Sequence, residues 1–241
     1  LDHILLLFNF EKKYFDKEDL KNTFVGHPLL DDKKNEKFVQ INEVLDNKKI
    51  ISIFPGSRES EIKIHTPILF NFVKKMNSKD KSYHFVFHST KKFYEILKAK
   101  LKNENLNNAE VISDDNLKNE ILKKSMFAIV KSGTISLEVC KSNIPSVIIY
   151  KMNFLNYYLA KFLLRIKYVN MINIINNKEV IPELIQKECN SDEIFRTVYY
   201  FLKKPNLIKD QLKHVKQTLN DLKSPTSSAD QASKVLLSYL V

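Results

Sequence analysis

Residues 49–58 have the sequence KIISIFPGSR, an apolar run that ends in a proline and a glycine. The run has the length of one buried strand, and the amphipathic residues from 61 onward are typical of a helix. Four more short apolar runs lie between residues 84 and 150, with amphipathic stretches between them. This alternation predicts an α/β fold, in which helices cover both faces of a parallel sheet.

The pattern also gives approximate bounds for the elements. The expected strands are Lys49 to Phe54, His84 to His88, Ala109 to Ile112, Met126 to Val130 and Ser146 to Tyr150. The clearest expected helices are Glu61 to Met76, Lys91 to Asn103, Leu117 to Lys124, Ile135 to Ser142, Phe154 to Lys167 and Ser191 to Lys203, followed by two near the carboxyl end. Residues 1–28 differ, because an apolar strand at Ile4 to Phe8 is followed by a charged helix and a loop at 24–28. We expect three segments, at 1–28, 29–225 and 226–241.

The composition favours an anionic partner. The chain has 241 residues and a net charge of +11, and none of its apolar runs approaches the ~18 residues of a membrane span. The partner is therefore a nucleic acid, a nucleotide or an acidic membrane surface. Because the excess of lysine, asparagine and isoleucine also reflects a bias of the coding genome, we expect no nucleic acid.

The cysteines and the first residues indicate the compartment and the start of the chain. Cys140 and Cys189 lie in or beside apolar helical stretches and lack metal-ligand spacing, which favours packing roles in a reducing compartment. The first residues do not form a signal peptide. Because the chain opens with Leu1 rather than methionine, we expect the protein to begin earlier.

Glycine is rare, so each glycine marks a place where other residues fit poorly. Average usage would give roughly 17 glycines, whereas the chain has 3. Gly56 and Gly133 each follow an expected strand and precede an expected helix. Ligands of parallel sheets bind beyond the carboxyl ends of strands, where helix amino ends offer unpaired N–H groups. We therefore expect the loops at 55–58 and 131–134 to hold one diphosphate together.

Arg58 and Glu138 add polar side chains to these loops. Arg58 offers a planar fork of donors for a leaving diphosphate, and the alternative is a tight turn with a solvated arginine. Glu138 lies one helical turn past Thr134, where a carboxylate would accept both ribose hydroxyls. Its alternative is an acid that offsets the helix dipole. The sequence lacks G-x-G-x-x-G and G-x-x-x-x-G-K, which argues against dinucleotide oxidoreductases and P-loop hydrolases.

Five groups of residues, taken in order, resemble the lipid-A-disaccharide synthase family. They are Phe24-Val25-Gly26-His27-Pro28-Leu29, Pro55-Gly56-Ser57-Arg58 with Glu61-Ile62, Ser132-Gly133-Thr134 with Leu137-Glu138, Tyr150-Lys151, and Pro182-Glu183-Leu184 with Gln186. The resemblance runs from Asp2 to about Gln186 and is weak beyond. It implies the GT-B architecture of two Rossmann-like domains. Segment 1–28 is then the end of the N-terminal acceptor domain, 29–225 the Rossmann-like UDP-binding domain, and 226–241 a C-terminal helix.

The resemblance implies an inverting hexosyltransferase of lipid A biosynthesis. The enzyme would transfer 2,3-diacylglucosamine from UDP-2,3-diacylglucosamine to 2,3-diacylglucosamine 1-phosphate (lipid X), with no cofactor and no metal ion. The donor-binding positions it implies are Gly56, Ser57, Arg58, Ser132, Gly133, Thr134, Glu138, Asn173, Glu183 and Gln186. Among these, Arg58 would stabilise the leaving diphosphate. For Glu183, which follows Pro182, the alternative is simply a good helix start.

Three positions raise separate questions. Asn9 stands where the family usually has a proline before Phe-Glu, which alters a junction. Ile172 stands where a proline is typical before Asn173, which changes the backbone there. His27 is either a contact of an inter-domain cleft or a turn residue before proline.

The reaction also needs a base that takes the proton from the acceptor hydroxyl. The resemblance places the family's carboxylates for this task in the first half, which this chain lacks. We therefore expect residues 1–241 alone to bind UDP weakly and to form no disaccharide.

Residues 152–169 combine many apolar side chains with lysine and arginine and contain no acid. Such a helix can lie in an anionic membrane interface. The alternatives are a buried helix or an inter-subunit contact, as in a homodimer. A diacylated substrate favours the membrane, and with it a cytoplasmic protein that is peripheral on the inner face of a Gram-negative inner membrane.

Two other functions stay open on the residues alone. One is another GT-B enzyme that uses a UDP-N-acetylglucosamine-type donor, such as a peptidoglycan glycosyltransferase or a 2-epimerase. The other is a non-catalytic protein that binds a membrane or nucleic acid through its basic surface. The combination of Gly26-His27-Pro28 with the residues from Pro182 to Gln186 favours the lipid A enzyme.

Overall fold

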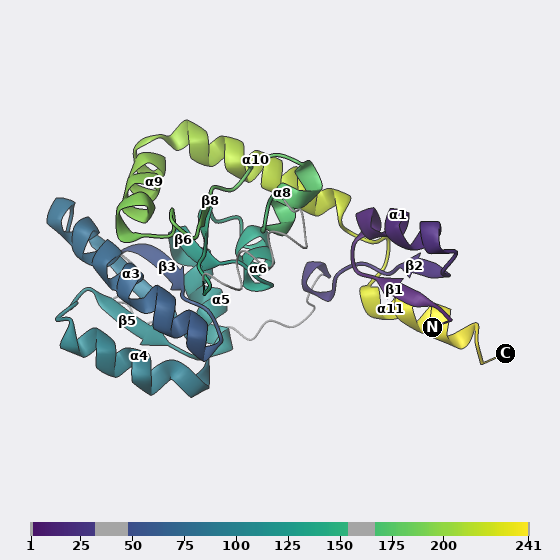
Figure 1. Cartoon of the computed structure of the whole chain (residues 1–241), viewed down its shortest axis with the longest axis horizontal. Helices are drawn as coiled ribbons and strands as arrows, with labels where there is room; N and C mark the ends of the chain where they lie inside the picture. The colour runs from purple at the N-terminus through teal and green to yellow at the C-terminus, as the bar shows by residue number, and fades with distance from the viewer. Residues whose placement is uncertain (1, 32–47, 154–166, 241) are drawn as a thin grey trace. The chain divides into compact units, whose positions relative to one another are not determined.

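The structure, a computed structural model, describes residues 2–31, 48–153 and 167–240, and the chain divides into two compact units (Figure 1). Unit 1 combines Leu1–Glu36 with Val215–Val241, and unit 2 is Lys37–His214. The division expected from the sequence, at 1–28, 29–225 and 226–241, differs because it separates the two ends of the chain. Hydrogen bonds within unit 1 join these ends, since the Asp31 carboxylate accepts from the backbone N and the Oγ of Ser228 at 3.0 and 2.6 Å.

Unit 2 contains a six-stranded sheet in which every neighbouring pair of strands is parallel. The strand order is β5-β4-β3-β6-β7-β8. The strands are β3 (Lys49–Phe54), β4 (Tyr83–His88), β5 (Ala109–Ile112), β6 (Ser125–Lys131), β7 (Ser146–Tyr150) and β8 (Glu183–Ile185). The predicted α/β class with a parallel sheet is confirmed.

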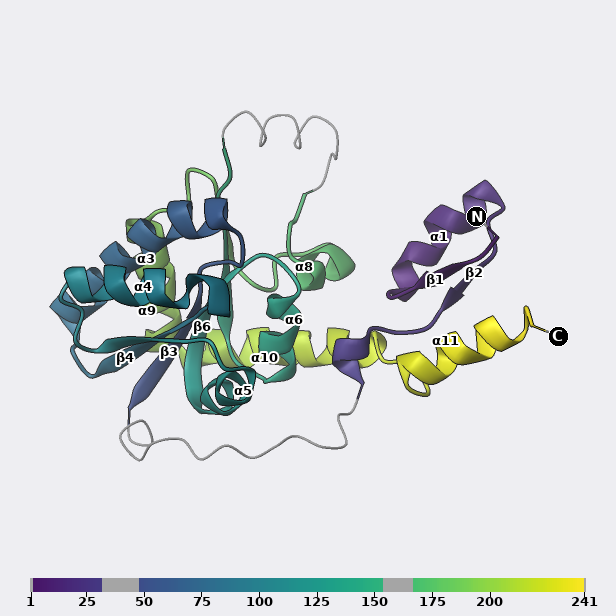
Figure 2. The same ribbon diagram turned by 90° about the horizontal axis from the view of Figure 1, so that it is seen from below.

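Helices cover both faces of this sheet. They are α3 (Glu59–Lys79), α4 (Lys91–Asn103), α5 (Asp115–Lys124), α6 (Ile135–Lys141), α8 (Met171–Asn176), α9 (Ser191–Lys203) and the first part of α10 (Pro205–Asp221), whose residues from Val215 onward belong to unit 1. Successive side chains of a strand point to opposite faces, so Ile51 and Ile53 pack in the core with α3 and α9, whereas Ile50 packs with Ile121 of α5. Figure 2 shows α3 and α5 on opposite sides of the sheet. Because both faces are buried, the central strands β3, β6 and β7 are mostly apolar rather than alternating.

The expected elements of unit 2 match the structure closely, except that the strand β8 and the short helix α8 were not expected. The interpretation of Pro182 and Glu183 as a helix start is wrong, because Glu183–Ile185 forms the edge strand β8 beside β7. A strand of 3 residues shows no periodicity in the sequence, and its formation depends on the hydrogen bonds that β7 offers. The expected helix Phe154 to Lys167 lies, apart from Lys167, outside the described residues.

Unit 1 begins with a parallel pair of short strands, β1 (Ile4–Leu6) and β2 (Asn22–Phe24), with α1 (Lys12–Phe15) between them. The strand expected at Ile4 to Phe8 ends at Leu6, because the backbone N of Phe8 donates to Glu11 Oε2 at 3.2 Å and starts a 3-10 turn at Asn9–Glu11. Helix α11 (Ser228–Leu237) completes the unit. Across the described ranges of both units, no helix combines the length and apolarity needed to cross a membrane.

Candidate functional site

Two glycine loops of unit 2 line one pocket. The loop at 55–58 follows β3 and the loop at 132–134 follows β6, and these two strands are hydrogen-bonded neighbours. Because the strands are parallel, their carboxyl ends lie at the same edge of the sheet. The pocket has a volume of about 320 Å³. The residues that line it are Phe54, Gly56, Ser57, Arg58, His88, Ser89, Thr90, Asp115, Lys118, Lys131, Ser132, Gly133, Thr134 and Ile135.

The charges around this pocket suit an anion. The side chains of Arg58, Lys118 and Lys131 line it together with the carboxylate of Asp115. The pKa of His88 is lowered to about 3, because burial disfavours the imidazolium and Lys118 repels it, so this ring is neutral. Three cationic side chains and one carboxylate thus line the pocket itself, while Glu61 and Glu138, which do not line it, pair with the same cations and offset their charge. A diphosphate would therefore depend on directed donors such as the Arg58 guanidinium more than on net charge.

Three residues of the pocket wall were not among the predicted site residues, namely Lys131, Lys118 and His88. Lys131 is the first residue of the predicted loop at 131–134, so its place in the chain was a usable signal. Lys118 comes from α5 and His88 from the end of β4. Only the order of strands in the sheet brings these two residues to the loops after β3 and β6.

Glu61 of α3 connects the two loops. Its Oε2 accepts from the backbone N of Ser57 at 2.9 Å and of Arg58 at 3.2 Å. Its Oε1 accepts from Arg58 Nη1 at 3.0 Å and from Lys131 Nζ at 2.8 Å. Burial raises the pKa of this carboxyl, but the hydrogen bonds from Lys131, Ser57 and Arg58 and the charge of Lys131 outweigh burial and lower the pKa to about 2. Glu61 is thus ionised at neutral pH, and a short-range network fixes both loops around it.

These bonds change the expected role of the first helix. The sequence predicts unpaired N–H groups at the amino end of α3, but the amides of Ser57 and Arg58 already donate to Glu61. The side chain of Arg58 is nonetheless 74% exposed, so its guanidinium can meet a ligand in the pocket. At this loop a diphosphate would be bound by a side chain rather than by these two amides.

The two glycines are needed for different reasons. Gly56 has φ +123°, and a Cβ there would lie 2.6 Å from both Cβ and Oε2 of Glu61. Gly133 has φ +155°, and its nearest neighbour would be Lys131 Nζ at 3.9 Å. Gly56 therefore makes room for Glu61, whereas Gly133 supplies a backbone conformation and leaves open space at the pocket.

Ser132 and Glu138 have partners within the protein. The Oγ of Ser132 donates to the backbone O of Val169 at 3.0 Å. Glu138 does not line the pocket, and its Oε2 lies 2.7 Å from Lys118 Nζ. Lys118 also approaches Asp115 Oδ1 at 3.2 Å; burial lowers its pKa, but the two carboxylates outweigh burial and raise it. A ribose near Glu138 would therefore also meet the Lys118 ammonium group.

The structure places the remaining predicted residues away from the pocket. Asn173 is fully buried, and its amide Nδ2 donates to the backbone O of Ile181 at 2.7 Å and to Glu183 Oε1 at 2.8 Å. Glu183 also accepts from the backbone N of Val169 and of Asn170, both at 2.9 Å. These bonds hold the segment from Val169 to Asn173 against β8, and none of these residues lines the pocket.

Gln186, which directly follows β8, has a similar role just beyond the end of β7. Its Oε1 accepts from the backbone N of Met152 at 2.9 Å. Ile172, which replaces a proline of the family pattern, donates its backbone N–H to Asn170 Oδ1 at 3.0 Å, a bond that proline could not make. The backbone before Asn173 is therefore held by the side chain of Asn170, which caps α8, instead of by a proline ring.

His65 of α3 fixes the loop after β3, and no pattern in the sequence predicted this role. Its Nδ1 donates to the backbone O of Pro55 at 2.8 Å, and its Nε2 accepts from the backbone N of Lys151 at 3.1 Å. Burial lowers the pKa of this imidazole against the opposing effects of the Pro55 carbonyl and Glu61. The neutral ring therefore ties the end of β3 to the end of β7.

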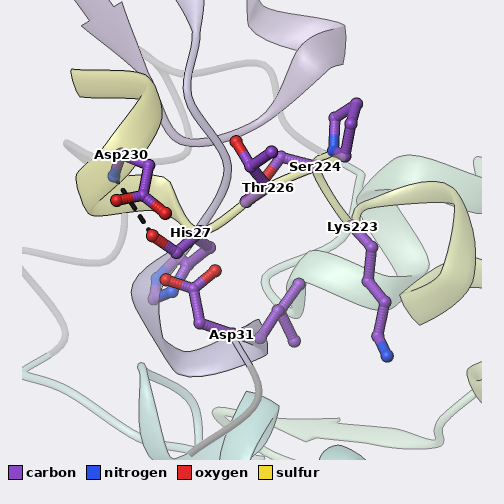
Figure 3. Close-up of a pocket in the computed structure, with 9 residues that line it drawn as sticks. His27, Asp31, Lys223, Ser224, Thr226 and Asp230 are labelled. Carbon is purple, nitrogen blue, oxygen red and sulfur yellow. Dashed lines mark hydrogen bonds between the residues drawn. The ribbon is translucent and has the colours of Figure 1, made fainter. Parts of the chain in front are cut away.

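A second pocket lies within unit 1 (Figure 3). It has a volume of about 350 Å³, and its lining includes His27, Asp31, Lys223 and Asp230. The backbone N of Leu29 donates to His27 Nδ1 at 3.2 Å, so His27 caps the turn that begins at Pro28. Figure 3 shows Lys223 extending away from His27 and Asp31. The structure thus gives His27 the expected turn role and also a place at a pocket wall.

Comparison with known proteins identifies relatives over almost the whole chain. A family model described as lipid-A-disaccharide synthetase matches residues 1–236. The lipid-A-disaccharide synthase of Persephonella marina is 32% identical over 249 residues, which cover 98% of this chain and 66% of that protein. The lipid-A-disaccharide synthase of Aquifex aeolicus is 30% identical over 221 residues, which cover 91% of this chain and 59% of that protein. The chain spans less than two thirds of the length of either relative.

Solved structures share the fold at much lower identity. A putative UDP-N-acetylglucosamine 2-epimerase from Listeria monocytogenes has a TM-score of 0.62 at 11% identity, over 96% of this chain and 57% of that chain. The MnaA–UDP co-structure from S. aureus has a TM-score of 0.60 at 13% identity, over 92% of this chain and 61% of that chain. These likenesses show the fold alone. The family model and the curated relatives agree with the resemblance found in the sequence motifs, and the chain belongs to the lipid-A-disaccharide synthase family.

Proposed function

We propose that this chain forms the donor-binding part of an inverting glycosyltransferase of lipid A biosynthesis. The enzyme transfers 2,3-diacylglucosamine from UDP-2,3-diacylglucosamine to lipid X and releases UDP and the lipid A disaccharide 1-phosphate. Family membership supports the reaction. The observation that carries the site is the pocket at the ends of β3 and β6, where both glycine loops meet three cationic side chains.

In this proposal the residues of the pocket bind and stabilise the diphosphate. The acceptor hydroxyl oxygen forms the new bond to the anomeric carbon, while the bond from that carbon to the diphosphate oxygen breaks. Negative charge grows on the departing UDP, and the Arg58 guanidinium donates to it. We propose that the phosphates enter at Gly133 and Thr134, and that the ribose lies toward Lys118 and its partner Glu138.

The proton of the acceptor hydroxyl must pass to a base. We expect that base in the part of the family's length that this chain does not match. The donor site and the acceptor site are then separate parts of one enzyme, and the experiment below tests the donor site.

Calorimetry with UDP tests the proposed site. The 241-residue chain should bind UDP, and Arg58→Ala and Glu138→Ala should each weaken binding by about tenfold or more, because each removes a charge-assisted hydrogen bond. Arg196→Ala and Glu95→Gln are matched controls, since both residues are exposed on other helices and should leave the affinity unchanged. No measurable binding of UDP to the parent, or full binding by both site variants, would refute the assignment.

We also propose that the protein is peripheral on the inner face of the inner membrane and contacts anionic lipid through residues 152–169. Residues 154–166 of this segment lie outside the described residues, so the proposal depends on their apolar and basic composition. Flotation with anionic liposomes should fall for the double variant Leu155→Glu plus Phe162→Glu relative to the parent. A homodimer that uses the same segment is the competing outcome, and it would instead show as a change of oligomeric state with unchanged flotation.

A further inference from the structure

We propose that Glu61 is a positioning residue of the donor site, whose carboxylate holds the loop at 56–58 and Lys131 together and so determines where the Arg58 guanidinium meets the diphosphate. This inference rests on the proposed function. Glu61 itself need not touch the nucleotide, because it does not line the pocket. It acts through Arg58, which does.

The first support is the number and origin of its donors. The carboxylate receives four hydrogen bonds, from the backbone N of Ser57, the backbone N and Nη1 of Arg58, and Lys131 Nζ. The side chain of Glu61 is 10% exposed, so water has little access to compete for these bonds. Three of the donors belong to Ser57 and Arg58, which follow β3, and the fourth belongs to Lys131 at the end of β6. A single buried anion therefore fixes the spacing of two loops that belong to different strands.

The second support is that Glu61 occupies some hydrogen-bond donors of the loop and leaves others to a ligand. The carboxylate already occupies the amides of Ser57 and Arg58 at the amino end of α3, so a phosphate placed against them would meet a like charge. The Arg58 guanidinium uses Nη1 for Glu61, and its remaining N–H groups find no further acceptor among the described residues. These groups project from a side chain that is 74% exposed and lines the pocket. Glu61 thus limits the rotamers of Arg58 while leaving its outer donors available to a ligand.

The third support is steric. The backbone at Gly56 makes room for Glu61, since a Cβ at that position would lie 2.6 Å from Glu61 Oε2. From the other side, His65 holds the backbone O of Pro55 and the backbone N of Lys151. The short loop between β3 and α3 is therefore fixed at both ends, so Arg58 starts from a rigid base. Such preorganisation raises affinity because fewer conformations are lost when the ligand binds.

A double-mutant cycle on UDP binding tests the inference in the 241-residue chain. Glu61→Gln keeps an acceptor oxygen for the amides but removes the charge that holds Arg58 and Lys131. We expect UDP affinity to fall by about tenfold in this variant. In the background of Arg58→Ala, the same substitution should change the affinity by less than about twofold, because the residue through which Glu61 acts is gone.

Two further measurements separate positioning from general damage to the fold. Uridine, which has no phosphate, should bind the parent and Glu61→Gln with equal affinity. A disturbed fold would instead lower the affinity for both uridine and UDP. Glu59→Gln is the matched control, because Glu59 is exposed on the first turn of the same helix and should bind UDP like the parent. If Glu61→Gln does not fold, Glu61→Asp carries the same cycle with the charge retained and the side chain one methylene shorter.

The outcomes distinguish this inference from the proposed function. If the parent binds UDP and Arg58→Ala weakens it, but Glu61 and Arg58 act additively, the donor site stands and the positioning role of Glu61 is overturned. If Glu61→Gln loses affinity for uridine and for UDP by the same factor, the positioning role is overturned as well. If the parent does not bind UDP, the proposed function fails and this inference fails with it.

Discussion

Asn173 offers a direct test of whether a predicted donor-site residue is instead part of the core. It is fully buried, and its side chain makes four hydrogen bonds: two from Nδ2, to Ile181 O and Glu183 Oε1, and two to Oδ1, from the backbone N of Val180 and Ile181. Each of these bonds contributes about 1 kcal/mol net, so Asn173→Ala should lower the free energy of unfolding by about 4 kcal/mol. That is a large fraction of the ~5–15 kcal/mol that stabilises a typical domain.

The assay is urea denaturation followed by circular dichroism at 222 nm, together with thermal unfolding. At about 2–4 °C per kcal/mol for a chain of this size, the thermal midpoint should fall by roughly 8–16 °C. Asn107→Ala is the matched control, because Asn107 is exposed and its loss should change stability by less than about 0.5 kcal/mol. UDP affinity, measured where both proteins are folded, should stay within about twofold of the parent.

Two results would refute this reasoning. A loss of stability below about 1 kcal/mol would mean that the four bonds are not worth their usual net energy in this structure. A fall in UDP affinity of about tenfold or more at unchanged stability would show that Asn173 contacts the donor, as its position in the family pattern implies.

Three further predictions concern the loops and the buried histidine. Gly56→Ala should lower the free energy of unfolding by about 1–3 kcal/mol more than Gly133→Ala, because only the first adds a collision with Glu61 to the backbone strain, and urea denaturation of both variants checks this. The Glu61 carboxyl has a pKa of about 2 against its usual 4.5, so the stability that it contributes is present above pH 4.5 and is lost as the pH falls toward 2; Glu61→Gln should flatten that part of the pH profile of urea midpoints. The His88 pKa is about 3 in the fold against its usual 6.5, so below pH 6.5 the unfolded chain binds a proton that the folded chain refuses; stability should fall between pH 6.5 and 4.5, and less so in His88→Asn. If the stability of the parent changes with pH no more than that of Glu61→Gln between pH 4.5 and 2, the first pH prediction is contradicted. The second is contradicted if the parent and His88→Asn lose equal stability between pH 6.5 and 4.5.

The fold of this chain is shared by proteins of very low sequence identity, so the fold alone does not choose the function. The putative UDP-N-acetylglucosamine 2-epimerase from Listeria monocytogenes and the MnaA–UDP co-structure from S. aureus align with nearly all of this chain at 11–13% identity. What separates the chain from them is its membership of the lipid-A-disaccharide synthase family, which the ordered motifs had already indicated. The detailed contacts of the pocket then decide which of the motif residues can meet a donor.

The sequence by itself determined the α/β class, most strand and helix bounds, and the two loops at the pocket. These features depend on local signals, namely apolar runs such as residues 49–54 and glycines at the strand ends, and a local signal needs no knowledge of the rest of the fold. The tertiary structure alone decided which side chains face the pocket. Lys118 and His88 reach it because α5 and β4 lie beside the two loop-bearing strands, while Asn173 and Glu183 turn inward because the short strand β8 needs partners. Sequence spacing does not encode such long-range neighbours, since they arise from the order in which parallel strands pair, and that order is set by the packing of the whole sheet.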